Sequence, residues 1–94
     1  MVWKNTLSDL DQILRKKRSA MIDAMVVCQK GRDPENEIIY ELILKCYSLV
    51  DEKRTRLSNI AIGYAADQQE AKIKGKEICV ALNENYPFVR KRVY

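Results

Sequence analysis

The chain has 94 residues, of which 47% are hydrophobic and 32% are charged, and its formal net charge is +4. This length fits a single domain. The sequence contains no histidine, which removes the commonest general base and the commonest zinc ligand. The three cysteines are not spaced as metal ligands, so we expect neither a metal nor another cofactor.

The sequence shows no sign of a membrane or secretory segment. No apolar stretch approaches the roughly 20 residues that a membrane-spanning helix needs, and the first residues lack the apolar block of a secretory signal. An odd number of cysteines without such a signal indicates a reducing compartment. We therefore expect a cytoplasmic protein that does not bind membranes.

The first predicted element is a long helix over residues 7–30. Few turn-forming residues are present, three glycines and two prolines, which favours helices over an all-β fold with a turn every ~10 residues. Thr6 suits a helix N-cap. The apolar residues that follow recur at intervals of three and four, with Lys17 taking one position of the series: Leu7, Leu10, Leu14, Met21, Ala24 and Cys28.

A turn at residues 31–33 is expected to lead into a second helix. Gly31 suits a helix C-cap, and Asp33 followed by Pro34 resembles the first turn of a new helix. The apolar residues after Pro34 predict a helix over residues 34–53. Because the connection is short, the two helices should be antiparallel neighbours.

The second half of the chain admits two interpretations. A polar stretch at residues 51–56 separates two apolar segments. Either one helix runs over 34–83, or the chain breaks there and a third helix spans 57–83. We favour the break. Asn85 and Pro87 should end the last helix, leaving an extended basic tail at 86–94. The predicted fold is all-α: an antiparallel helical hairpin extended to a three-helix bundle, dimerising through the second half of the chain.

The leading functional hypothesis is a non-enzymatic module for protein–protein interaction: an adaptor, regulator or chaperone that forms a homodimer or binds a partner helix. No nucleophile–base pair and no glycine-rich phosphate loop is present, so no catalytic residue is assigned. The later helices carry more apolar surface than the first helix can cover, and the remaining surface should bind a partner. The residues expected to form that surface are Ile60, Tyr64, Ile78, Leu82, Tyr86, Phe88 and Tyr94.

The alternative hypothesis is a nucleic-acid-binding helical dimer. The tail contributes three of the four net positive charges, and two more basic clusters lie at residues 15–18 and 53–56. Such cations would contact phosphates. The residues proposed for this role are Arg15, Lys16, Arg18, Lys53, Arg54, Arg56, Arg90, Lys91 and Arg92.

Overall fold

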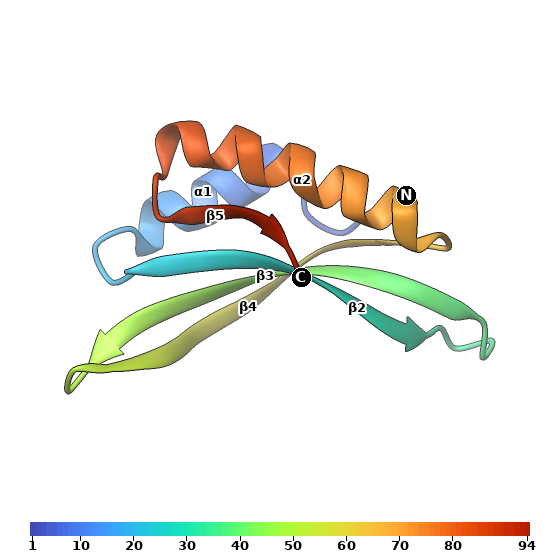
Figure 1. Cartoon of the computed structure of the whole chain (residues 1–94), viewed down its shortest axis with the longest axis horizontal. Coiled ribbons are helices and arrows are strands. Elements are labelled where there is room, and N and C mark those ends of the chain that lie inside the picture. The colour runs from blue at the N-terminus through green and yellow to red at the C-terminus, as the bar shows by residue number, and fades with distance from the viewer.

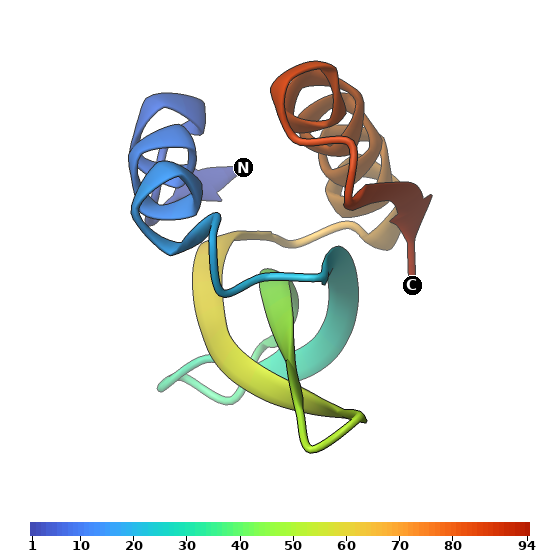
Figure 2. The same cartoon turned by 90° about the vertical axis from the view of Figure 1, so that its left-hand side faces the viewer.

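The computed structural model describes residues 1–94 and contains five strands and two helices, so the prediction of an all-α three-helix bundle is wrong. One strongly curled sheet carries both helices on the same face (Figure 1, Figure 2). In chain order the elements are β1 (Val2–Trp3), α1 (Leu7–Lys17), β2 (Asp23–Arg32), β3 (Ile38–Val50), β4 (Lys53–Ala65), α2 (Gln68–Asn85) and β5 (Val89–Val93).

The strands form a single sheet in the order β1-β4-β3-β2-β5. The three central strands pair antiparallel, whereas β5 pairs parallel to β2. The tail expected at 86–94 is therefore largely a strand at one edge of the sheet. At the other edge, β1 pairs only with Gly63 and Tyr64 of β4, so the stretch of β4 from Lys53 to Ile60 has no neighbouring strand on that side.

The segment expected to be helical over 18–30 is mostly strand β2 because its pattern fits a strand equally well. Ala24 and Cys28 lie four residues apart, as on a helix, but Ala24, Val26 and Cys28 also alternate, as on a strand. All ten residues of β2 pair with β3. This pairing outweighs the helical tendency of the segment, which ends α1 at Lys17 instead of residue 30.

The predicted helix over 34–53 and the first part of the predicted helix over 57–83 are replaced by the long β3–β4 hairpin, whereas residues 68–83 are helical and belong to α2. Leu42, Leu44 and Cys46 of β3 are fully buried under the helices. Their neighbours on the opposite face, such as Ile43 and Tyr47, are half-buried. Because both faces carry apolar residues, the alternation that marks a strand is hidden in the sequence.

Two turns replace the expected helix start at Asp33 and the expected break near residue 55. The Asp33 carboxylate accepts hydrogen bonds from the backbone N–H groups of Glu35 and Glu37, so it closes a hairpin loop instead of capping a helix. Asp51 and Glu52 join β3 to β4 with φ angles of 50° and 65°. A two-residue turn of this kind normally contains glycine or asparagine, which is why the sequence does not reveal it.

The core lies between the sheet and the two helices. Leu10 and Leu14 of α1 and Leu82 of α2 pack against the covered face of β2, β3 and β4. At the start of α1, the Thr6 hydroxyl accepts from the Asp9 N–H and the Asp9 carboxylate accepts from the Thr6 N–H, which satisfies two otherwise unpaired donors. Neither helix has the length and apolar content that a membrane crossing requires.

Candidate nucleic-acid interface

One end of the molecule is organised around the carboxylate of Asp23, the first residue of β2. Its Oδ2 atom accepts from Arg54 of β4 at 2.8 Å and from Arg90 of β5 at 2.7 Å. The Asp23 side chain is only 13% exposed, whereas the two arginines are 40% and 45% exposed. Two cations from distant parts of the chain thus share one anion, which leaves an excess of positive charge at this point.

An aromatic ring supports one of these cations. The guanidinium carbon of Arg54 lies 3.6 Å from the ring centroid of Tyr47 on β3, a stacked cation–π arrangement. Arg56 is the partner of Tyr47 across the β3–β4 pair, and Asp23 is its partner across the β2–β3 pair. Asp23, Tyr47 and Arg56 therefore lie in one row across the face of the sheet that no helix covers.

The C-terminal half of α1 reaches the same end of the molecule. Between α1 and β2, the Ile22 N–H donates to the carbonyl of Tyr47 on β3 at 3.0 Å, which holds this connection beside β3. Arg18 lies over the ring of Tyr86, 5.7 Å from its centroid, and forms no ion pair. Arg15 pairs with Asp11 at 3.0 Å. The Tyr86 hydroxyl and then the Asp11 carboxylate raise the pKa of Arg15, so it remains charged.

We call this region the basic end. It is the left side of the molecule in Figure 1, with the end of α1 and the start of β5 in the upper part and the β3–β4 turn in the lower part. Four carboxylates lie in the same region, those of Asp11, Asp23, Asp51 and Glu52. The basic end therefore has four more positive than negative charges, which equals the formal net charge of the chain. The difference is three if Glu84 near the end of α2 is included. The eight cations of the basic end are Arg15, Lys16, Lys17, Arg18, Lys53, Arg54, Arg56 and Arg90.

The basic end continues into the uncovered face of the sheet. Behind the row of Asp23, Tyr47 and Arg56 comes a row of Met25, Lys45 and Asn59. The next two rows are Val27, Ile43 and Ala61, and then Gln29, Glu41 and Tyr64. This face thus has a cationic first row, Lys45 in the second row, an uncharged third row, and Glu41 beside Tyr64 in the fourth row.

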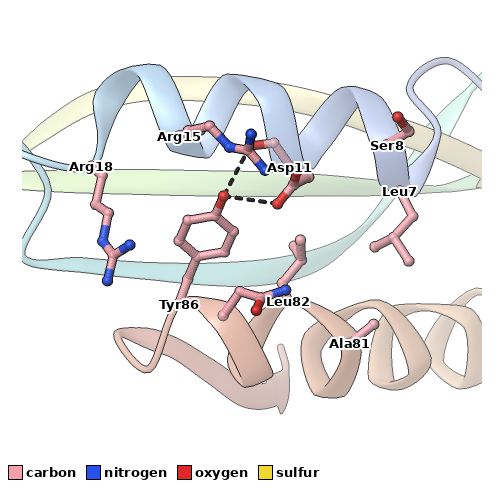
Figure 3. A pocket seen from close by; sticks show the side chains of 9 residues that line it. Leu7, Ser8, Asp11, Arg15, Arg18, Ala81, Leu82 and Tyr86 are labelled. Carbon is pink, nitrogen blue, oxygen red and sulfur yellow. Dashed lines mark hydrogen bonds and ion pairs between the residues drawn. The ribbon is translucent and has the colours of Figure 1, made fainter.

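A groove lies on the opposite side of the sheet, between the two helices. Its wider part, about 690 Å³, is lined by Leu7, Arg18, Leu82, Tyr86 and neighbouring residues. Figure 3 shows the Tyr86 hydroxyl between the two helices, 2.8 Å from Asp11 Oδ1 and directed toward α1. This hydrogen bond links the end of α2 to the middle of α1.

The predicted nucleic-acid residues are largely brought together. Seven of them lie at the basic end, although they come from three separate segments of the sequence. Lys91 and Arg92 lie farther along β5, both exposed. No local feature of the sequence marks Asp23 or Tyr47. Both residues contact Arg54, which lies 31 residues from Asp23 and 7 residues from Tyr47 along the chain.

The predicted partner-binding residues do not form one surface. Ile60 is buried in the core at 8% exposure, whereas Tyr64 lies on the uncovered face of the sheet. Ile78, Leu82 and Tyr86 are buried, with the groove between the helices beside them. Phe88 packs against Tyr86 with ring centroids 5.9 Å apart, and Tyr94 is 50% exposed at the end of the chain.

The three cysteine thiols are not activated. Burial raises the pKa of the Cys28 and Cys46 thiols and raises that of Cys79 to about 11. A thiol with a raised pKa carries little thiolate at neutral pH and is a poor nucleophile there.

The chain matches no protein-family model, no curated protein and no solved structure.

Proposed function

We propose that this protein binds single-stranded nucleic acid through the basic end and the adjoining uncovered face of the sheet. The observation that carries this proposal is that eight cations from α1, β4 and β5 lie at one end of the molecule, on both sides of the sheet, together with four carboxylates. Such an excess of charge at one place attracts a polyanion. The fold thus brings to one end cations that lie in three separate segments of the sequence.

The types of side chain favour phosphate as the ligand. Five of the eight cations are arginines, and a guanidinium group can donate two parallel hydrogen bonds to one phosphate. Arg18 and Arg56 have no carboxylate partner, and Arg90 shares its partner with Arg54. These groups are available to a phosphate without breaking a one-to-one ion pair.

The uncovered face favours a single strand over a duplex. Tyr47 and Tyr64 lie partly exposed on this face, outside the helical layer, and the Tyr47 ring already carries the Arg54 guanidinium on one side. Bases of a single strand can stack on aromatic rings whatever their identity, and each stacked base adds about 1–3 kcal/mol. In a duplex the bases are already stacked on each other, so the same tyrosines would contribute nothing.

The hypothesis of a helical interaction module loses its main support. It depended on apolar helix surface that the first helix could not cover. Of the residues predicted for that surface, Ile60 and Tyr64 lie in β4, and four belong to the buried core: Ile60, Ile78, Leu82 and Tyr86.

The proposal is tested by fluorescence anisotropy with a labelled single strand of about 16 nucleotides. If three or four phosphates are contacted, the slope of log K against log salt should be about −2 to −3. A double variant, Lys53→Gln with Arg56→Gln, removes two cations that form no ion pair. We expect it to weaken binding and to make the slope less negative by about 1.4.

The matched control is the double variant Lys72→Gln with Lys76→Gln, which removes two exposed, unpaired cations from α2, away from the basic end. It should bind almost as well as the wild type. Equal losses in both double variants would show only a general effect of net charge. The proposal is wrong if the wild type fails to bind at about 50 mM salt, or if it binds a duplex more tightly than the single strand.

A further inference from the structure

The groove between the helices is open, and it has a largely apolar part and a wider part that polar and charged residues line together with apolar ones. Both helices run in the same direction, and Figure 2 shows them side by side above the sheet. A second hollow of about 480 Å³ adjoins the wider part, and it is lined by Trp3, Thr6, Leu7, Glu77, Ile78 and Ala81. The two hollows share Leu7 and Ala81, so they form one groove. Trp3 and Leu7 on its wall are 44% and 43% exposed.

The outer face of α2 carries a stripe of residues that nothing covers. Ile73 and Val80 are each 50% exposed, and Glu77 and Glu84 lie between and beyond them. The intervals of four, three and four residues place all of them on one face of the helix. This face points away from the sheet, because the residues packed on the core, such as Ala71 and Ile78, lie on the opposite side of α2.

The stripe and the groove match in their apolar residues and in one pair of unlike charges, although Glu77 belongs to both the stripe and the groove. Ile73 and Val80 match the apolar wall formed by Trp3, Leu7 and Ala81. At the end of the groove, Arg18 has no carboxylate partner within the chain. Glu84, at the corresponding end of the stripe, also forms no ion pair.

We propose that the groove is filled by a second copy of this chain, so that α2 of each copy lies along the groove of the other. A two-fold axis nearly parallel to α2 produces this arrangement. Rotation about such an axis keeps the two helices in the same direction, which places Glu84 of one copy level with Arg18 of the other. The contact is then isologous, because each copy supplies both the groove and the stripe.

The exposure of the groove favours a second copy over a small ligand. A small-molecule site usually encloses about 70–90% of the ligand surface. This groove is open along its whole outer side, and its walls Trp3 and Leu7 remain nearly half-exposed. A helix lying in an open groove needs contacts on one side only. Ala81, which lies in both hollows, has a small side chain that permits the close approach of another helix.

Light scattering of the purified protein without nucleic acid tests the proposal. The wild type should have a mass of about 22 kDa, twice the 11.0 kDa of one chain. Val80→Lys should reduce the mass to that of one chain, because it places a charge at the centre of the contact. Lysine is a better helix former than valine and lies near Glu77 and Glu84 on α2, so the helix itself should be preserved.

The matched control is Val50→Lys, since Val50 is also a valine with 50% exposure but lies at the end of β3. It should remain a dimer at the same concentration. Circular dichroism reports whether each variant is folded, and Ile73→Lys takes the place of Val80→Lys if that variant does not fold. A dimer in both Val80→Lys and Ile73→Lys would overturn the proposal, as would a wild type with the mass of one chain at its highest soluble concentration.

A charge exchange tests the orientation of the two copies. Arg18→Glu and Glu84→Arg should each weaken dimerisation, because like charges then meet, and the double variant should restore it. If the double variant is as weak as the single variants, the proposed arrangement is wrong. None of these measurements uses nucleic acid, so they test the dimer separately from the proposed function. In the dimer Arg18 pairs with Glu84 of the other copy, which leaves Arg54, Arg56 and Arg90 to contact phosphates.

Discussion

The carboxylate of Asp23 should contribute to stability and oppose binding at the same time. In Asp23→Asn the side chain keeps its shape but loses the charge that holds Arg54 and Arg90 together. We expect the variant to unfold at a lower temperature than the wild type and, while folded, to bind nucleic acid more tightly. These two effects have opposite signs, so the variant separates the role of Asp23 in the fold from its effect on the interface.

The expected loss of stability follows from the geometry of the three groups. Each ion pair is partly exposed, with arginine side chains 40% and 45% exposed, so each contributes about 0.5–1 kcal/mol. Both guanidinium groups lie close to one oxygen atom in the wild type too, so their mutual repulsion is present before and after the substitution and adds nothing to the loss. The total is therefore about 1–2 kcal/mol, which lowers the Tm of a domain of this size by roughly 4–16 °C.

Thermal unfolding followed by circular dichroism measures the first effect, and anisotropy below the unfolding transition measures the second. The matched control is Glu35→Gln, which removes the same charge from an exposed side chain that forms no ion pair. Its Tm should stay close to that of the wild type. An unchanged Tm in Asp23→Asn, or weaker binding by the folded variant, would refute the reasoning.

Two further predictions concern the core and one edge of the sheet. Gly63→Ala should destabilise the protein by about 1–2 kcal/mol, because the added Cβ would collide with the backbone oxygen of Val2 on β1; in a chain lacking residues 1–3, urea unfolding should show almost no effect of the same substitution. Because burial raises the pKa of the Cys79 thiol to about 11, the unfolded chain loses this proton near pH 9 while the folded protein retains it. The free energy of unfolding should therefore fall between pH 9 and 11, by on the order of 2 kcal/mol, and Cys79→Ala should abolish that part of the decrease; an identical pH dependence in both proteins would contradict this.

The start of α1 could be predicted from local signals, whereas the sheet could not. Thr6 and Asp9 satisfy each other's backbone groups within four residues, so their role is visible in the sequence. The strands depend on partners far away: Ala24 pairs with Cys46 on one side and with Val89 on the other. An interval of three or four between apolar residues cannot distinguish a helix from a strand when both faces of the strand are apolar.

The basic segments could be identified from the sequence, but their convergence could not. Residues 15–18 and 53–56 stand out as local clusters of charge. Only the pairing of β2 with both β3 and β5 brings Arg54 and Arg90 to the same carboxylate. Asp23 itself lies among apolar residues with no local feature that marks it as the centre of the interface.

The basic residues of β4 have a second effect, because the outer edge of this strand pairs with β1 only at Gly63 and Tyr64. An uncovered strand edge can recruit strands of other molecules and start aggregation, and lysine or arginine on such an edge opposes this. Lys53, Arg54 and Arg56 all lie on the part of this edge that has no neighbouring strand. Neutralising them should therefore reduce the solubility of the folded protein, so selection for solubility alone would tend to preserve the charges that we assign to nucleic-acid binding.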